Sequence, residues 1–258
     1  MSTYLLPILY TIAVWWASTG VILYLNGLPR ATHPWTMLFA TVLLGVALVG
    51  LFATRDDTRV SGAYLAFTCA LLVWAWQEVA FLLGYVTGPR RTPCPTGSTG
   101  WRRAGYALQT LLHHELALIV LGLAVAAITW GGANPTGLAA FMIFWVMRQS
   151  AKLNVFLGVR NLSEDFLPPH LKYLQTYFRR APMNALFPVS VAASSWLAVL
   201  LWQAASADGV GAFEATALTF SGTLLSLAIL EHWFMVLPLP SQALWNWGLR
   251  SRTADPPA

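Results

Sequence analysis

Long apolar stretches follow one another through almost the whole of this chain, and each is long enough to cross a lipid bilayer as a helix. A bilayer core needs about 20 residues of helix. The predicted spans cover residues 4–25, 35–54, 60–86, 106–130, 137–159, 185–207 and 213–239. Only 10% of the residues are charged, whereas about 25% is usual in a water-soluble domain. The sequence therefore predicts an all-α polytopic membrane protein, a bundle of seven transmembrane helices that forms one integral membrane domain over residues 1–258.

The positions of lysine and arginine predict the orientation of the bundle, because short loops rich in these residues stay on the cytoplasmic side. Most of the 15 cations lie in alternate connections or in the tail, namely Arg30, Arg90, Arg91, Arg102, Arg103, Arg160, Lys172, Arg179, Arg180, Arg250 and Arg252. The opposite connections hold Arg55 and Arg59, whose charges are offset by Asp56 and Asp57. We therefore predict a periplasmic N-terminus and a cytoplasmic C-terminus, with residues 240–258 as a short cytoplasmic tail. The basic charge gives no sign of nucleic-acid binding.

Ionisable side chains inside the predicted spans are the main functional signal. Such a group costs about 2.5–3.5 kcal/mol in the hydrocarbon on insertion scales, so it usually faces the bundle interior and marks a functional site. The candidate ligand-binding site, or buried polar cluster, consists of Glu78, His113, His114, Glu115, Arg148, Lys152, Asn154, Glu231 and His232. No residue is assigned as catalytic.

Counting along the predicted helices at about 1.5 Å per residue places these groups at one depth. Glu78 comes late in a span that runs inward, and His113 comes early in the span that returns. Arg148 and Lys152 lie one helical turn apart in the fifth span, the most polar of the seven. We expect four helices to contribute polar groups to one layer in the cytoplasmic half of the bundle.

Several interpretations of this layer stay open. Its members can satisfy one another and fix helix packing only. They can bind a metal, with Glu78, His114, Glu115, Glu231 and His232 as candidate ligands, although the Glu-x-x-His spacing of di-iron bundles is absent from the sequence. They can hold a pigment, with the two cations neutralising its acid groups. A proton-coupled transporter would instead use the buried acids as proton carriers.

Two predicted cytoplasmic connections are longer than the others. Residues 87–105 are rich in Pro, Gly and Arg, which indicates an irregular loop that could close over a site. In the second connection, apolar residues recur at helical spacing after Pro168 and Pro169, at Leu171, Leu174, Tyr177 and Phe178. This pattern predicts a short helix in the membrane interface. The 13 tryptophans, several of them near span ends, are expected to form interfacial belts.

Four long strings carry a family resemblance. They are the Glu78 region continuing into FLLGYVTGPRRTPCP, HHELAL at 113–118, AKLNVFLGVRNLSEDFLPPHLKYLQTYFRRAPMNALFPVS at 151–190 and LEHWFMVLPLPSQALWNW at 230–247. Together they resemble the PuhE family of photosynthetic complex assembly proteins from purple and related phototrophic bacteria. The resemblance implies a multi-pass protein of the bacterial inner, photosynthetic intracytoplasmic membrane, linked to the gene neighbourhood of the reaction-centre H subunit. It brings no catalytic residues with it.

The resemblance also implies a function, in the assembly of reaction-centre and light-harvesting complexes through an influence on bacteriochlorophyll supply. We therefore expect an assembly factor that handles bacteriochlorophyll or a precursor at its intramembrane polar site. Its expected partners are the lipid bilayer and the reaction-centre or light-harvesting subunits. The alternative is a membrane-embedded metalloenzyme of the di-iron type that acts on a pigment or lipid precursor, so the sequence leaves open whether the protein is an enzyme.

Overall fold

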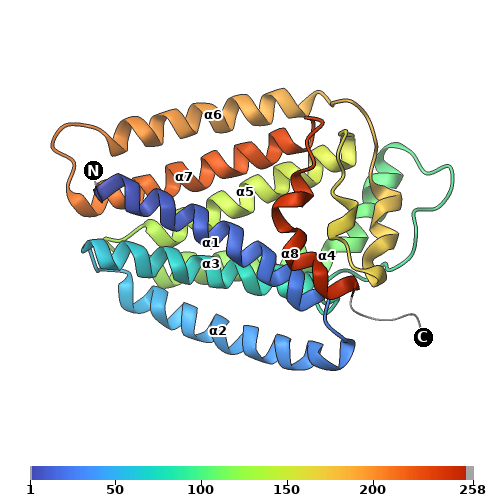
Figure 1. The fold of residues 1–258 in the computed structure, drawn as a ribbon, viewed down its shortest axis with the longest axis horizontal. Coiled ribbons are helices and arrows are strands. Elements are labelled where there is room, and N and C mark those ends of the chain that lie inside the picture. Colours follow the sequence, from blue (N-terminus) through green and yellow to red (C-terminus); the bar gives the residue numbers. More distant parts are fainter. Residues whose placement is uncertain (1, 254–258) are drawn as a thin grey trace.

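The computed structural model describes residues 2–253, and the regular structure in that range is helical. Seven long helices lie side by side (Figure 1): α1 (Ser2–Asn26), α2 (His33–Thr54), α3 (Val60–Leu82), α4 (Gly100–Thr129), α5 (Thr136–Leu157), α6 (Leu186–Ala205) and α7 (Ala212–Phe234). The short elements are α8 (Asn246–Leu249) and the 3-10 helices η1 (Arg30–Thr32), η2 (Glu164–Phe166), η3 (Pro169–Tyr177), η4 (Ser241–Trp245) and η5 (Arg250–Thr253). The prediction of an all-α protein is confirmed.

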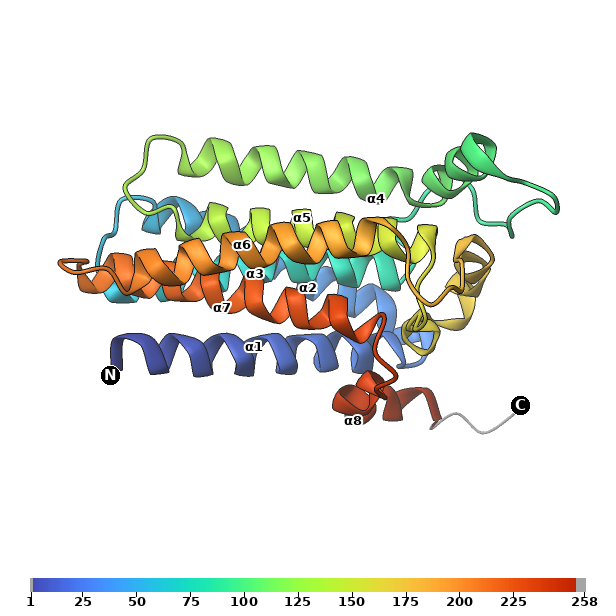
Figure 2. The same ribbon diagram turned by 90° about the horizontal axis from the view of Figure 1, so that it is seen from above.

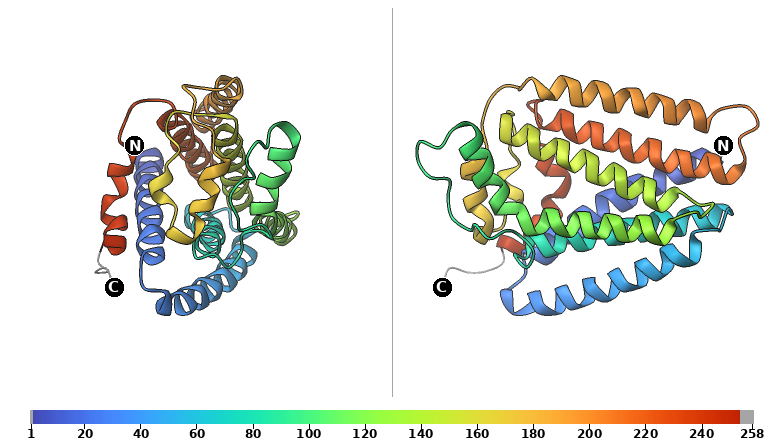
Figure 3. Two further views of the ribbon diagram at one scale, coloured as in Figure 1. Left: turned by 90° about the vertical axis from the view of Figure 1, so that its right-hand side faces the viewer. Right: turned by 180° about the vertical axis from the view of Figure 1, so that it is seen from behind.

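Six of the long helices in the described range are long and apolar enough to span a membrane, and α5 is the exception. The polar side chains of α5, two of them cationic, lower its hydropathy. The helix nevertheless packs against α3, α4, α6 and α7, and it lies between α4 and α7 (Figure 3). The chain is thus a multi-pass membrane protein in which the one long helix of the described range that does not qualify as a span contacts four helices that do.

Two helices, α3 and α7, end four or more residues earlier than the predicted spans. α3 ends at Leu82 and not at residue 86, because Gly84 adopts φ = 83° and the Tyr85 N–H donates to the Ala80 carbonyl at 2.9 Å. A left-handed glycine just after the last turn is a common way to end a helix. α7 ends at Phe234 and not at residue 239, shortly before two prolines that offer no N–H for a further helical turn.

The connections gather at the two ends of the bundle as the predicted topology requires (Figure 1). Residues 27–32, 83–99, 158–185 and 235–253 lie at one end, at the right of the view. The connections 55–59, 130–135 and 206–211 lie at the other end, with the N-terminus. The first end holds the connections rich in Arg and Lys, and we call it the basic end.

Two apolar cores hold α5 in place. One combines α2, α3, α4 and α5 and includes Leu51, Val73, Leu118 and Phe141, each at most 1% exposed. The other joins α3, α5 and α7, where the rings of Phe67 and Phe220 stack with centroids 4.4 Å apart. Because such cores are close-packed, they fix the rotation of α5 and so the direction of each of its polar side chains.

The stripe that we expected in the membrane interface packs into the protein instead. η3 forms over Pro169–Tyr177, and its Leu171 and Leu174 are buried against Phe81 and Leu82 at the end of α3. The early end of α3 leaves those two side chains at the basic end, and η3 covers them. The apolar stripe therefore faces protein and not lipid.

The loop after α3 is bonded into the middle of α4. The His114 backbone N–H donates to the Thr87 carbonyl at 2.9 Å, and the Arg90 N–H donates to the Gln109 carbonyl at 3.2 Å. Gly88 permits this approach, because a Cβ there would lie 2.1 Å from the Gln109 carbonyl oxygen. Backbone groups that bond outside a helix cause kinks, and α4 changes direction toward its N-terminal end (Figure 2).

The C-terminal segment packs along α1 (Figure 2). The rings of Trp15 and Trp245 meet edge to face with centroids 5.1 Å apart, and those of Trp16 and Trp247 lie 5.3 Å apart. Trp15 and Trp16 thus contact the C-terminal segment, and the Trp16 side chain stays 42% exposed. Of the predicted tail, residues 241–253 follow this path, and residues 254–258 lie outside the described residues.

Candidate functional site

α5 directs a lysine and a glutamine at one carboxylate of α4. Lys152 Nζ lies 2.6 Å from Glu115 Oε1, and Gln149 Nε2 donates to Glu115 Oε2 at 2.5 Å. The Lys152 and Glu115 side chains are only 21% and 19% exposed. Because both charges are largely removed from water, each depends on the other for its solvation.

A second ion pair joins α5 to α3. Arg148 Nη2 lies 2.9 Å from Glu78 Oε2, and the Arg148 side chain stays 43% exposed. Glu231 of α7 is also exposed and accepts a hydrogen bond from Trp15 Nε1 at 2.7 Å. The three charged groups, Glu78, Arg148 and Glu231, belong to α3, α5 and α7, which pack against one another. We call Trp15, Glu78, Arg148 and Glu231 the open polar patch.

Neutral hydrogen bonds connect α5 to α7 and to the start of α6. His232 Nε2 lies 2.8 Å from Ser150 Oγ, and His232 Nδ1 lies 2.9 Å from the Ala228 carbonyl. In a neutral ring Nδ1 must then donate to that carbonyl, and Nε2 accepts the Ser150 hydroxyl. Asn154, fully buried, receives the Asn184 amide on its Oδ1 at 3.0 Å. The polar groups of His232, Ser150 and Asn154 are therefore hydrogen-bonded within the protein.

The two adjacent histidines of α4 separate. His113 is exposed, whereas His114 is 2% exposed, and its ring lies 4.8 Å from the Phe81 ring. Neighbouring residues of a helix point about 100° apart. His114 lies within the layer, where the charges of Lys152 and Arg148 reach it, and His113 points elsewhere.

Three side chains of the layer carry buried polar atoms that have no hydrogen-bond partner within residues 2–253. They are both amide atoms of Gln77, Oε1 of Glu78 and Nδ1 of His114. More than about 90% of buried polar groups in proteins are hydrogen-bonded, and an unsatisfied one costs about 1–3 kcal/mol. These atoms are thus unsatisfied inside the bundle, where they are closed off from the surface.

The predicted metal ligands do not converge. Across the described part of the chain, no three His, Cys, Asp or Glu side chains are grouped closely enough to hold a metal ion. Glu115 is engaged by Lys152 and Gln149, and His232 by Ser150 and a backbone carbonyl. The donor set therefore does not fit a metal centre in this arrangement.

Five residues of the layer are absent from the predicted cluster. Gln77 and Gln149 had a signal in the sequence, because each is a polar residue next to a charged one in a predicted span. No such signal marked Trp15, Ser150 or Asn184, because tryptophan and small polar residues are common in membrane helices and at their ends. Their roles follow from which helices become neighbours.

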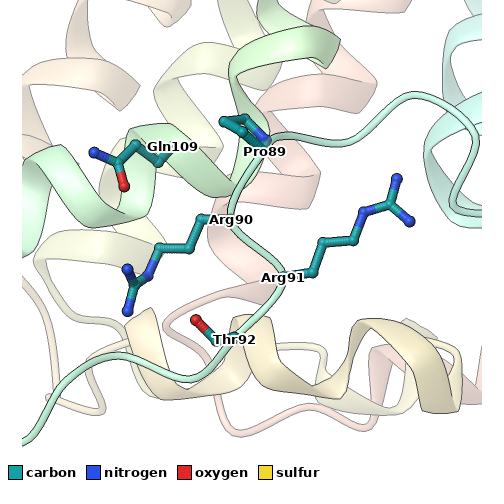
Figure 4. Close-up of a pocket in the computed structure, with 5 residues that line it drawn as sticks. All are labelled: Pro89, Arg90, Arg91, Thr92 and Gln109. Carbon is teal, nitrogen blue, oxygen red and sulfur yellow. The ribbon is translucent and has the colours of Figure 1, made fainter.

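At the basic end, a shallow pocket of about 310 Å³ is lined by Pro89, Arg90, Arg91, Thr92 and Gln109 (Figure 4). Arg90 is held by the protein: its Nε donates to Tyr177 Oη at 2.7 Å, and its guanidinium lies 4.6 Å from the centre of the Tyr106 ring. Arg91 points the other way (Figure 4). The two neighbouring arginines therefore contact different parts of the basic end.

Comparison with known proteins gives the chain relatives along its whole length. Residues 1–255 match the family described as "Protein of unknown function (DUF3623)". The chain is 42% identical over 249 residues to the "Uncharacterized 30.4 kDa protein in puhA 5'region" of Rhodobacter capsulatus, which covers 94% of this chain and 90% of that protein. No solved structure matches the chain. The position of the relative beside puhA in a photosynthetic bacterium agrees, at the level of the locus, with the resemblance seen in the sequence. The chain belongs to the DUF3623 family.

Proposed function

We propose that this protein is a PuhE-type assembly factor of the photosynthetic membrane that binds bacteriochlorophyll or a precursor at its intramembrane polar layer. The position of the relative near puhA supports a role in photosynthetic complex assembly. The observation that supports a ligand is the open polar patch, because Arg148 and Glu231 lie within long helices of the bundle and remain exposed.

The open polar patch calls for a polar contact from outside the protein. A charge that faces hydrocarbon costs about 2.5–3.5 kcal/mol on insertion scales. Glu78 bonds to Arg148 through Oε2, and its buried Oε1 has no partner among residues 2–253. Arg148 binds through one Nη, and a guanidinium has five N–H donors in all. A ligand with a few oxygens on a large apolar body would cover such a patch.

Tetrapyrrole pigments have this composition: a flat apolar macrocycle with carbonyl and carboxyl groups at its edge. In our proposal Arg148 donates to an edge carbonyl or carboxylate, and Glu231, held by Trp15, accepts from a donor group. His114 does not fit the role of axial ligand where it stands, because its ring is 2% exposed and lies against Phe81. The Lys152–Glu115 pair joins α5 to α4 at the edge of the layer, and its role is to hold α5 in its packed position.

Complementation of a phototrophic host that lacks the gene tests the proposal. Tagged wild type, Arg148→Gln and Glu231→Gln would be compared with Glu214→Gln, a matched control in which an exposed glutamate at the opposite end of α7 changes in the same way. We expect wild type and control to restore the absorbance of the reaction-centre and light-harvesting complexes and to retain a tetrapyrrole on purification. The two patch variants should lose most of both at equal amounts of folded protein.

Two results would contradict the proposal, one of them wholly and the other in part. If both patch variants restore the complexes fully and the purified wild type carries no tetrapyrrole, the proposal is wrong. If the complexes depend on the patch but no pigment is bound, the assembly role stands and the pigment role is overturned.

We also propose that α5 is a seventh span, with the N-terminus in the periplasm and the basic end in the cytoplasm of the inner membrane. Cys94 is a natural reporter, because it lies in the loop of the basic end, whereas Cys69 lies within α3. In a Cys69→Ser background, a membrane-impermeant maleimide should label Cys94 in inside-out vesicles but not in spheroplasts. Asp208→Cys in a background that lacks both native cysteines should give the reverse, and labelling of Cys94 in spheroplasts would invert the orientation.

A further inference from the structure

A second pocket at the basic end is lined on several sides by cationic and imidazole side chains. It measures about 330 Å³ and lies between the start of α2, the end of α3 and η3. Arg30 and His33 come from η1 and α2, Arg91 from the loop after α3, and His170 from η3. No acidic side chain lines it. Three segments that are distant in sequence, residues 30–34, 83–91 and His170, therefore converge on one basic pocket.

The pocket is built and not merely a chance gathering of flexible side chains. Arg91 donates from Nη2 to the Gly84 carbonyl at 3.2 Å, and His33 Nε2 lies 3.0 Å from the Leu28 carbonyl. The His170 ring sits against Gly84, where a Cβ would lie 3.1 Å from the ring. His33 is 8% exposed. These contacts hold His33, Arg91 and His170 in place before any ligand arrives, and Arg30 is exposed at the edge of the pocket.

The basic groups lack counter-charges. Neither Arg30 nor Arg91 forms an ion pair with a carboxylate of residues 2–253, and the buried His170 Nε2 has no hydrogen-bond partner there. Burial lowers the pKa of His170, and the charges of Arg30, His33 and Arg91 add to this effect. Cations that repel one another without an anion between them favour the binding of one. The N-terminus of α2, whose dipole also favours an anion, borders the same pocket.

The surroundings indicate where such an anion would come from. Trp35 is 72% exposed and Tyr85 49% exposed, which is typical of aromatic side chains at the level of lipid headgroups. Along α2, a row of apolar side chains leads away from the pocket and is exposed on the surface: Leu38, Phe39, Val42, Val46 and Val49. This row offers acyl chains a path directly below a headgroup in the pocket.

We propose that this pocket binds the phosphate of an anionic membrane phospholipid, with Arg30, Arg91 and His170 on the phosphate and the acyl chains along α2. Basic pockets between helices on the cytoplasmic side are a recognised way to bind anionic headgroups. The site is separate from the polar layer and does not depend on the pigment proposal.

Lipid binding to the purified full-length protein tests this site. The probe is fluorescent phosphatidylglycerol in neutral detergent micelles, and the double variant Arg30→Gln/Arg91→Gln removes the two arginines. Both are exposed side chains, so their loss should leave folding intact. Arg102→Gln is the matched control, because it removes an exposed cation of the basic end outside the pocket. A charge-assisted hydrogen bond contributes about 1.5–3 kcal/mol, so the double variant should bind at least about 10-fold more weakly.

Further measurements distinguish a lipid phosphate from free phosphate and test whether the site exists. Phosphatidylcholine should bind weakly, and inorganic phosphate should compete only at much higher concentration than the lipid. If inorganic phosphate alone binds tightly in the same arginine-dependent way, the lipid assignment is overturned. Equal binding by the double variant, Arg102→Gln and wild type would remove the site. A His170→Gln variant, read in the same assay with its thermal midpoint in lipid-free detergent, should bind about 10-fold more weakly and unfold at an unchanged temperature.

Discussion

Removal of the Lys152 ammonium leaves the Glu115 carboxylate inside the bundle with one neutral donor, Gln149. We predict that Lys152→Met lowers the free energy of unfolding by about 3 kcal/mol, at the low end of the about 3–5 kcal/mol lost when one partner of a buried ion pair is removed. The low end applies because the two side chains remain 21% and 19% exposed. The ratio of folded to unfolded protein should then fall about 100-fold.

Equilibrium unfolding in mixed micelles, followed by circular dichroism, measures this difference. Adding Glu115→Gln to Lys152→Met should recover most of the loss, because a neutral amide is cheaper to bury than an unpaired carboxylate. The control is Glu164→Gln, which breaks an ion pair with Arg180 whose side chains are 64% and 38% exposed. Such exposed pairs contribute about 0–1 kcal/mol. If Lys152→Met costs no more than this control, or if the second change recovers nothing, our account of the layer is refuted.

Three further predictions test other parts of the structure. Gly88→Ala should destabilise the protein by about 1–3 kcal/mol through overpacking, because its Cβ would meet the α4 backbone, whereas Gly105→Ala has nothing within 4 Å and should be neutral or slightly stabilising in thermal unfolding. Trp15→Phe should cost about 1.5 kcal/mol, as expected for a hydrogen bond to a charged group, and Trp16→Phe less, because Trp16 donates to the neutral Leu244 carbonyl. The Arg59 guanidinium lowers the pKa of Asp57 from 3.8 to about 2, so the stabilisation from Asp57 is complete above its unfolded value and fades as pH falls through about 2. The thermal midpoints of wild type and Asp57→Asn should therefore converge over that interval, and a constant gap would contradict the assignment.

Hydropathy was sufficient to predict the helices, because a span of apolar residues long enough to cross a bilayer leaves few alternatives to a helix. The predicted limits fail where local chemistry decides the end, as at Gly84 after α3. The short helix was wrongly predicted to lie in the membrane interface for a different reason. An apolar stripe indicates that its side chains are shielded from water, but not whether lipid or protein shields them. In the structure they pack against Phe81 and Leu82.

Depth along a helix was also predictable, since each residue advances it by a fixed rise. Rotation was not, because helix packing sets which side of α5 meets which neighbour. The sequence therefore indicated that Glu78, Glu115, Arg148 and Lys152 share a layer, but could not assign Lys152 to Glu115 or Arg148 to Glu78. It also could not separate His113 from His114 or bring Trp15 to Glu231.

The two carboxylates that receive the cations of α5 belong to α3 and α4, which precede it in the chain. Because a protein emerges from the ribosome N-terminus first, Glu78 and Glu115 are already made when Arg148 and Lys152 reach the translocon. Both carboxylates are therefore present before the arrival of a helix that is too polar to partition into lipid alone. A circular permutant that began with α5 would reverse this order and expose both cations before their partners had been synthesised.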